Sequence, residues 1–540
     1  MLSFSGQREL RQVLRILALC IVLVFSLSAC TTPETTPQQP GAEIDDQEPG
    51  GGVLRVAITA YPPSMDPSTA WTHLGSIVTQ HVTESLVTYA EDWSIIPCLA
   101  EDYWSNDDAT EWTFTLRQGV PFHNGSVMTS ADVKASFDRF LSASPRASDL
   151  ANLDRIEIVD DYTVVLYMSA PTPILPAFLA YPMAGVFIMP EEVLAGLPDT
   201  PLPPDKIVGT GPYRLANAVP DMHIILEKFE QYAQDDRFDG PTGYGGFKTA
   251  YFDEIRLIPV PEASSRVAGI LTGDYDFAQD LPKNEYESLL QADGVVALVN
   301  PAQWMPVFYL NQRQPPFDNL SMRRALQYTF DMNEIMFSAA QLEDFYRIDS
   351  SLFFQEQVWH CDIGTELGLY NSPDHDKVRE LLDEAGYNDE PIIFITNPDY
   401  DWMHRSAIVA ADQMQQAGFN VRLEVYDWPT AISVRNTTDN WHIFVSGDSM
   451  PYDGSYMNYW HTDQDWLGYS NPRVDELLEE GMSHTDFDTR YAVYCEFSKV
   501  VYEDVVYIKL GDLHELHGLR DNLKGYRTHT ALRFWDTYID

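Results

Sequence analysis

The chain has 540 residues, of which 45% are hydrophobic and 21% are charged, enough to bury a large core over roughly three or four units of domain size. Asp and Glu number 81 against 34 Lys and Arg, which gives a formal net charge of -47. That charge excludes the positive footprint that nucleic acids require and a polybasic patch for an anionic membrane. An ordinary acidic secreted surface and a salty habitat would each account for it.

The first 29 residues have the pattern of an export signal. Three arginines precede an apolar run over residues 16–27. This run fits the roughly 7–15 residues of a signal core and is shorter than the about 20 residues that span a bilayer. Leu27-Ser28-Ala29-Cys30 resembles the bacterial lipobox, which implies cleavage before Cys30 and lipid on its sulfur. The alternative is an uncleaved anchor with an incidental cysteine. Both place a tethered body outside the cytoplasm.

Residues 30–52 are predicted to form a disordered tether. They are rich in Thr, Pro, Gln, Glu and Gly and almost free of apolar side chains. Such a segment cannot bury enough surface to offset the entropy that ordering costs. The folded body is therefore expected to begin near Val53.

Three cysteines remain in the body once Cys20 is assigned to the signal and Cys30 to the lipid. They are Cys98, Cys361 and Cys495. An exported protein can form disulfides, and three cysteines allow one bridge and one free thiol. The sequence leaves all pairings open.

Hydrophobic spacing predicts mixed α and β structure in the first part of the body. Residues 53–58 alternate as a strand, and residues 77–87 carry apolar side chains at helical spacing. A half-buried strand is predicted where apolar residues at 112, 114 and 116 alternate with threonines. Thr129 or Ser130 is expected to cap the next helix. Its apolar face consists of Val133, Phe137, Phe140 and Leu141.

The second half alternates between helices and strands. The predicted elements are helix 378–385, strand 392–395, helix 404–416, strand 421–425, helix 489–504 and strand 505–510. Gly386 and Gly418 stand where a left-handed residue ends a helix. Strand–helix–strand order implies a crossover and a partly parallel sheet. The last thirty or so residues are predicted to form irregular strands.

Six blocks along the body occur together in one order. They are 51–57 with 62–67, 112–133, Val208-Gly209-Thr210-Gly211-Pro212-Tyr213, 264–276, 310–326 and Gly468-Tyr469-Ser470-Asn471-Pro472. In this order they resemble the family-5 extracellular solute-binding proteins, which include the oligopeptide, dipeptide and nickel receptors of ABC importers. No single block establishes the resemblance. Six blocks in the order found in the family are not explained by chance.

The resemblance implies an α/β fold of the large, peptide-receptor type: a two-lobed periplasmic-binding-protein clamshell with an extra domain inserted in lobe I. Lobe I would comprise 53–97, 205–303 and 506–540, the inserted domain 98–204, and lobe II 304–505. Two chain crossings, near Trp304 and Val506, would form the hinge, since hinge motions concentrate in a few terminal residues of elements.

The resemblance also implies that the loop after residues 442–446 holds the ligand between the lobes. Many members have Trp after the glycine, where this chain has Asp448. Asp448 and Asp453 are candidate grips for a cation, although neither coincides with the family's amine anchor. Dipeptide receptors hold the ligand carboxylate with an Arg where this chain has Asn397. These departures argue against a strict dipeptide ligand.

Aromatic residues in segments expected at the cleft are further candidates for the ligand site. They are Trp71, Trp304, Tyr309, Trp402, Trp428, Tyr452 and Trp460. Each residue alone is more often part of a core than of a pocket. As a group they predict an aromatic-lined cleft suited to peptides, aromatic solutes or sugar rings.

Taken together, the resemblance implies an extracytoplasmic receptor, lipid-anchored in the periplasm or on the outer face of the membrane. It would deliver peptide-like solutes to ABC permease subunits driven by cytoplasmic ATPases. We expect a monomer without cofactor, metal site or catalytic residues. Two alternatives stay open. One is a receptor for an oligosaccharide, opine or metal chelate. The other is a secreted esterase, because Gly447-Asp448-Ser449 is similar to the GDSL nucleophile block.

Overall fold

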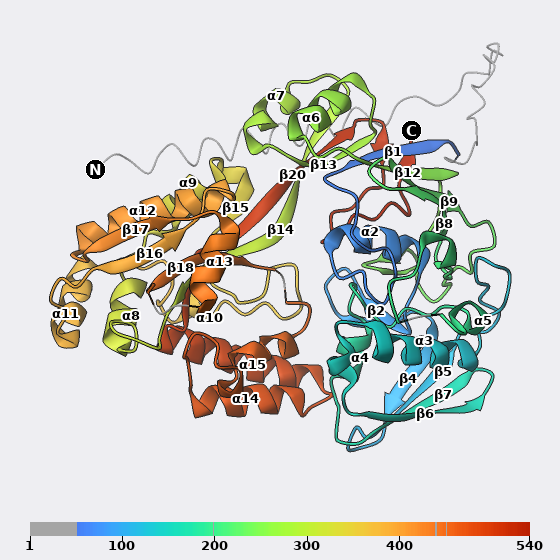
Figure 1. The fold of residues 1–540 in the computed structure, drawn as a ribbon, viewed down its shortest axis with the longest axis horizontal. Helices are drawn as coiled ribbons and strands as arrows, with labels where there is room; N and C mark the ends of the chain where they lie inside the picture. Colours follow the sequence, from blue (N-terminus) through green and yellow to red (C-terminus); the bar gives the residue numbers. More distant parts are fainter. Residues whose placement is uncertain (1–50, 198, 438–439, 450) are drawn as a thin grey trace, which may run out of the picture. The chain divides into compact units, whose positions relative to one another are not determined.

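The computed structural model describes residues 51–197, 199–437, 440–449 and 451–540. The predicted signal, the lipid site Cys30 and the tether as far as residue 50 lie outside the described residues. Within the described ranges, no helix is long and apolar enough to cross a membrane. The body is a two-lobed α/β clamshell (Figure 1).

One sheet of twelve strands runs through both lobes in the order β17-β16-β18-β14-β20-β13-β1-β12-β9-β8, with β15 beside β20 and β19 beside β14. Its strands are β1 (Val53–Ile58), β8 (Tyr213–Val219), β9 (His223–Lys228), β12 (Glu254–Pro259), β13 (Phe277–Leu281), β14 (Val295–Leu310), β15 (Tyr346–Arg347), β16 (Ile392–Thr396), β17 (Val421–Val425), β18 (Ile443–Asp448), β19 (Tyr507–Lys509) and β20 (Asp512–Arg520). Strand β16 is parallel to both β17 and β18, which confirms the predicted crossover connection.

Strand β14 takes part in both halves of this sheet. Its residues 295–300 pair with β20, and its residues 305–310 pair with β18. The register against β20 shifts between Asn300 and Trp304, and Ala302 there has a φ of 52°. A bulge of this kind bends a strand and increases its local twist. The crossing expected near Trp304 falls at this bulge.

A separate antiparallel sheet, in the order β4-β5-β7-β6, lies within the segment predicted to be inserted, and the limits of that domain stay a prediction. Its strands are β4 (Ala100–Ser105), β5 (Glu111–Leu116), β6 (Leu153–Asp160) and β7 (Thr163–Met168). Short pairs complete the β structure: β2 (Val87–Tyr89) with β3 (Ile95–Pro97), β10 (Pro241–Thr242) with β11 (Gly245–Gly246), and β21 (Leu523–Lys524) with β22 (Tyr538–Ile539).

The α-helices of the described residues lie beside the strands in both lobes (Figure 1). They are α2 (His73–Val82), α3 (Ser130–Ala143), α4 (Leu175–Leu179), α5 (Glu191–Leu194), α6 (Ala263–Thr272), α7 (Tyr286–Leu290), α8 (Leu320–Gln327), α9 (Met332–Ala340), α10 (Ile363–Glu366), α11 (His375–Ala385), α12 (Asp401–Ala417), α13 (Trp428–Thr437), α14 (Pro472–Met482) and α15 (Phe487–Asp504). Thr129 caps α3, and its backbone N–H donates to the Asp132 carboxylate at 2.7 Å. Gly386 and Gly418 end α11 and α12 in the left-handed conformation, as predicted.

Two sequence predictions need correction. The helix predicted over 77–87 ends at Val82, and Val87 opens strand β2, because the apolar residues beyond Thr83 are buried by a different element. Leu141, predicted to face the core, is 38% exposed. The final segment, predicted to form irregular strands, contains β20, a nine-residue strand whose register shifts against both β13 and β14. Burial on both faces removed the alternation that predicts a strand.

The Val208–Tyr213 block packs against the end of helix α2. A Cβ added to Gly209 would collide with the carbonyl oxygen of Val82, and one added to Gly211 would collide with that of His81. The glycines therefore allow the two backbone segments to approach closely. Between them, Thr210 donates to the buried Glu84 at 2.9 Å, and Glu84 also pairs with Lys248 at 2.9 Å.

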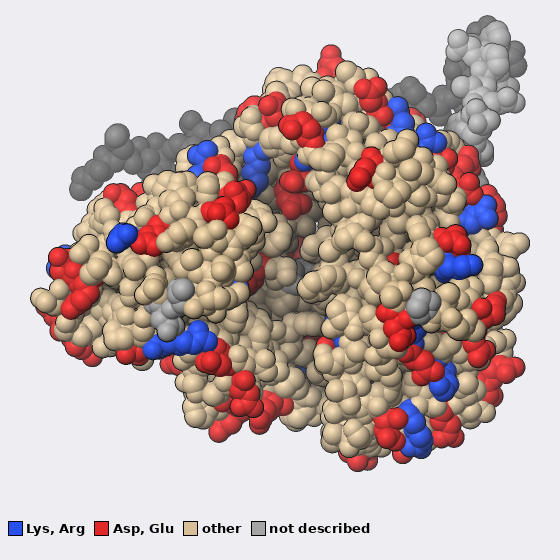
Figure 2. Space-filling view, in the orientation of Figure 1, with Lys and Arg blue, Asp and Glu red and all other residues tan. Residues whose placement is uncertain are grey.

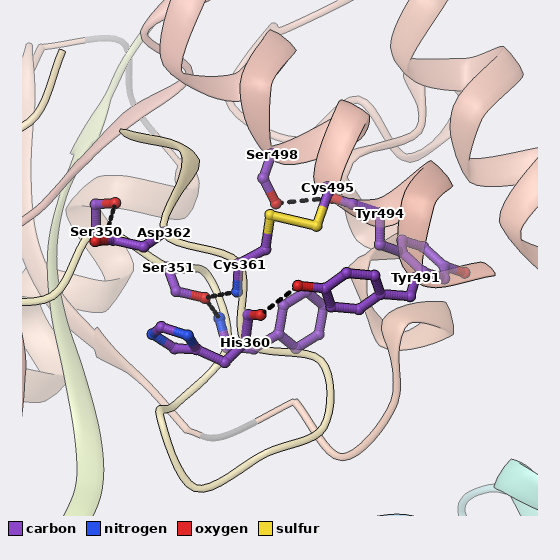
Figure 3. The surroundings of a disulfide bond; sticks show 10 residues. Ser350, Ser351, His360, Cys361, Asp362, Tyr491, Tyr494, Cys495 and Ser498 are labelled. Carbon is purple, nitrogen blue, oxygen red and sulfur yellow. Dashed lines mark hydrogen bonds between the residues drawn. A yellow bond between two sulfur atoms is a disulfide. The ribbon is translucent and has the colours of Figure 1, made fainter. Parts of the chain in front are cut away.

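Cys361 and Cys495 form a disulfide, and Cys98 is a buried free thiol. Figure 3 shows that the bond joins the segment before α10 to helix α15. Beside it, the Tyr491 hydroxyl donates to the His360 carbonyl at 2.8 Å, and the Cys361 N–H donates to Ser351 Oγ at 3.0 Å (Figure 3). The bridge closes a loop with a sequence separation of 134.

We expect the double substitution Cys361→Ser and Cys495→Ser to lower the free energy of unfolding by about 2–4 kcal/mol, because the unfolded chain regains the entropy of the closed loop. Urea denaturation under oxidising conditions measures the change. Cys98→Ala is the matched control, since it removes a thiol outside the bridge. Equal unfolding midpoints for the double variant and the wild type would contradict the expectation.

Candidate functional site

A cavity of about 460 Å³ lies at the end of strand β18, within the 300–1,000 Å³ typical of ligand pockets. Its lining residues are Tyr181, Met305, Tyr309, Arg435, Ser446, Gly447, Asp448, Ser449, Pro451, Tyr452, Tyr456, Met457, Tyr459 and Trp466. Tyr181 follows α4 on the side of the four-stranded sheet, and the other lining residues belong to the predicted lobe II. Figure 2 shows the molecular face hollowed between the two lobes. We call the cavity of about 460 Å³ the Asp448 cavity.

Asp448 ends strand β18 and faces Tyr309 of the neighbouring strand β14. The Tyr309 hydroxyl donates to Asp448 Oδ1, whereas Asp448 Oδ2 is buried and has no hydrogen-bond partner within the described residues. Burial raises the pKa of Asp448 to about 6, although hydrogen bonding with Tyr309 and Tyr459 and the charge of Arg435 lower it. A carboxylate in this setting gains strongly from a cationic partner.

Arg435 of helix α13 brings a cation to the same cavity. Its guanidinium carbon lies 5.1 Å from the Phe444 ring centre and 5.4 Å from that of Trp466, within cation–π range. Burial lowers the pKa of Arg435, and attraction to Tyr309 and Asp448 raises it. The cavity therefore presents an anion and a cation among aromatic rings.

The two lobes touch across the cavity through tyrosines. The Tyr181 ring lies 4.8 Å from that of Tyr452 and 5.2 Å from that of Tyr456. Arg146 donates to the Tyr456 hydroxyl at 2.9 Å, and its guanidinium stacks 3.5 Å from the Tyr181 ring centre. These contacts form one wall of the cavity.

Three of the predicted site residues line the cavity together: Tyr309, Asp448 and Tyr452. Trp460 lies behind Tyr309 and stacks on Tyr507 at 5.1 Å. Sequence reasoning missed Tyr181, Arg435, Tyr456, Tyr459 and Trp466. The density of aromatic residues after residue 451 was a signal for three of them, whereas Tyr181 and Arg435 are brought in only by the fold.

The other predicted aromatic residues and Asn397 are not part of this lining, although Trp304 and Trp402 lie directly beside it. Trp304 and Trp402 flank Gly447, where an added Cβ would lie 3.6 Å and 3.0 Å from their rings. Trp428 packs against Tyr400 with ring centres 5.2 Å apart. Asn397 is buried and accepts from the Tyr400 N–H at 3.1 Å, and Trp71 is 65% exposed.

Asp453, the second acidic residue predicted to bind a ligand cation, forms an ion pair within the protein. It is 1% exposed and binds Arg490 with both oxygens, at 2.5 and 3.1 Å. It also caps the short 3-10 helix η5 (Gly454–Trp460) by accepting from the Ser455 N–H at 2.9 Å. This arrangement fixes the loop between Tyr452 and η5.

We expect Asp448→Asn to stabilise the ligand-free protein at pH 7 and to change its stability least near pH 4. The folded-state pKa of Asp448 is raised from 3.8 to about 6. The contribution of this carboxyl to the free energy of unfolding is therefore fully present below pH 4, where it is protonated, and is lost as the pH rises through 6. Urea denaturation at both pH values measures the difference.

Asp453→Asn provides the contrast at pH 7. It leaves Arg490 buried without its counter-charge, which costs about 3–5 kcal/mol. A stability difference between Asp448→Asn and the wild type that is the same at pH 4 and pH 7 would contradict the predicted titration.

Comparison with known proteins assigns the family. Residues 94–467 match the bacterial extracellular solute-binding proteins, family 5 middle. A probable peptide ABC transporter periplasmic-binding protein, y4tO of Sinorhizobium fredii, is 27% identical over 441 residues, 77% of this chain and 80% of that protein. The periplasmic oligopeptide-binding protein OppA of Haemophilus influenzae is 24% identical over 94% of this chain and 95% of its own length.

A solved structure has the same fold. The ABC transporter substrate-binding protein CtaP from Listeria monocytogenes superposes with a TM-score of 0.79 at 20% identity, covering 91% of this chain and 99% of its own. The relatives are transport proteins, which points to a non-enzymatic function. The family match spans more than half of the chain. The chain therefore belongs to family 5 of the bacterial extracellular solute-binding proteins.

Proposed function

We propose that this solute-binding protein is the lipid-anchored, monomeric receptor of an ABC importer and that it captures a peptide-like solute bearing a positive charge. The observation that carries the ligand class is Asp448 Oδ2, a buried carboxylate oxygen without a hydrogen-bond partner among the described groups, at the wall of an aromatic cavity. A cation is the partner that compensates such an oxygen most effectively.

The surroundings of Asp448 support an amine-bearing ligand that also carries an acidic group. The rings of Tyr309, Tyr452 and Trp466 offer faces for apolar stems or cation–π contact. Arg435 lies in the same lining and is suited to a carboxylate. The transport of peptides by the named relatives agrees with a ligand of this chemistry.

The same charges also suit a non-peptide solute such as an opine, which combines an amine with carboxylates. The esterase alternative has less support, because Asp448 hydrogen-bonds to a tyrosine hydroxyl and the relatives are transport proteins. Mass spectrometry of solutes that co-purify with the protein distinguishes a peptide from an opine directly.

Asp448→Asn is expected to weaken the binding of an amine-bearing ligand by about 2–5 kcal/mol, because the ligand cation loses a buried counter-charge. Isothermal titration calorimetry with a short peptide identified by co-purification measures the dissociation constant. Asp412→Asn is the matched control, since Asp412 is exposed on helix α12. An unchanged dissociation constant for Asp448→Asn would remove this residue from the site.

Ligand is expected to shift the lobes toward the closed state about the crossings near Trp304 and Val506. A ligand that bridges both lobes binds the closed state more tightly and increases its population. Small-angle scattering should show a smaller radius of gyration with ligand. At about 100 times the dissociation constant, the ligand should also add roughly 2.7 kcal/mol of apparent stability. A stabilising ligand that leaves the scattering curve unchanged would refute closure.

Cys30→Ser is expected to abolish incorporation of a radiolabelled or clickable fatty acid and to release the body or leave an unprocessed precursor. The basis is the Leu27-Ser28-Ala29-Cys30 sequence after the apolar run. Cys98→Ala is the control, because it leaves that sequence intact. Persistent labelling of Cys30→Ser would refute the lipid site.

A further inference from the structure

A second pocket lies between the four-stranded sheet and helix α15, outside the Asp448 cavity. Its volume is about 410 Å³. Six aromatic side chains line it: Trp93, Tyr103, Trp104, Trp112, Trp359 and Phe487. Trp359 and Phe487 come from the predicted lobe II, and the other four from lobe I and the segment predicted to be inserted. We call it the aromatic pocket.

The charges in the lining of the aromatic pocket compensate each other. The charged residues of its lining are Asp453 and Arg490. They form the bidentate ion pair described above. The Arg490 guanidinium also lies 5.0 Å from the Trp359 ring centre. Because this pair is satisfied internally, the pocket offers no free charge to a ligand, and its recognition chemistry is that of aromatic faces.

Two aromatic residues of the lining are left partly open to water. Trp104 is 49% exposed and Phe487 is 40% exposed, and the Phe487 ring lies 4.8 Å from the buried Trp359. Large apolar side chains that remain exposed around a concave, aromatic-lined space are typical of a binding site. A flat ring inserted here would cover both and stack on the indoles behind them.

We propose that the aromatic pocket binds an uncharged planar aromatic group and thereby bridges the inserted segment and lobe II. A group held by both sides binds better when the lobes are together, so its occupancy favours the closed state. This proposal does not depend on the importer function or on the ligand class assigned to Asp448.

The aromatic pocket is coupled to the Asp448 cavity through one loop. Tyr452 lines the Asp448 cavity, and the next residue, Asp453, lines the aromatic pocket. Trp93, in the aromatic pocket, lies 5.1 Å from the Tyr452 ring. The aromatic group can therefore come from a free small molecule or from the far end of a ligand whose amine is at Asp448.

Indole is the probe for the pocket, titrated into the full chain and followed by saturation-transfer NMR. We expect saturable binding that weakens at least fivefold in Phe487→Ala and in Trp104→Ala. Phe337→Ala is the matched control, because Phe337 is 50% exposed on helix α9, outside the lining. Both pocket substitutions are at exposed positions, and thermal melting verifies that each variant is folded.

The peptide Ala-Ala-Trp distinguishes the two sources of the aromatic group. If its affinity falls at least fivefold in both Asp448→Asn and Phe487→Ala, one ligand spans both sites. If it falls in Phe487→Ala alone, the pocket takes a free aromatic molecule. Indole binding that does not saturate, or that is equal in Phe487→Ala and Phe337→Ala, overturns the proposal. If Asp448→Asn leaves the binding of an amine-bearing ligand unchanged while indole still binds, only the ligand class proposed for the Asp448 cavity is refuted.

Discussion

The two lobes share one hydrogen-bonded sheet, and strand β14 is the member that both depend on. Its first part is paired with β20 and its last part with β18, so neither half-sheet is complete without it. Ladder pairing restrains each part, and the bulge between Asn300 and Trp304 is where the strand can bend. The return crossing beside it is held by Asp512, which binds Lys509 at 2.9 Å and Arg347 at 2.7 Å. The hinge that we propose therefore involves a short segment of the chain.

The buried charged residues fall into two kinds: those that form ion pairs within the protein and Asp448, which we propose binds the ligand. Glu84 with Lys248 and Asp453 with Arg490 are buried pairs whose partners come from distant parts of the chain. Removing one member of such a pair is costly, because the other remains buried without compensation. Asp448 differs, since its Oδ2 lacks a partner within the described structure and burial raises its pKa to about 6. This incompletely hydrogen-bonded carboxyl marks the wall of the cavity where we propose that a solute cation binds.

Local sequence signals predicted much of lobe II. The glycines that end α11 and α12 and the apolar alternation of β16 and β17 are short-range features, and they led to the correct crossover. The sequence signal was weakest where the strand is buried on both faces. Strand β20 carries His514, Glu515 and His517 among its apolar residues and is buried on both faces, which removes the period of two. The helix expected to continue to Val87 ended at Val82 for a related reason, because core residues of two elements followed each other at helical spacing.

The sequence by itself determined the family, the α/β class and the candidacy of the loop after β18, because these rest on ordered blocks and local periodicity. Only the tertiary structure shows that Cys361 forms a disulfide with Cys495 and that Asp453 forms an ion pair with Arg490. It also places Tyr181 and Arg435 in the same cavity lining as Asp448. Cys361 and Cys495 are separated by 134 positions, and Tyr181 and Asp448 by even more of the chain. Contacts over such separations depend on how the elements pack, and residue types or spacing do not encode them locally.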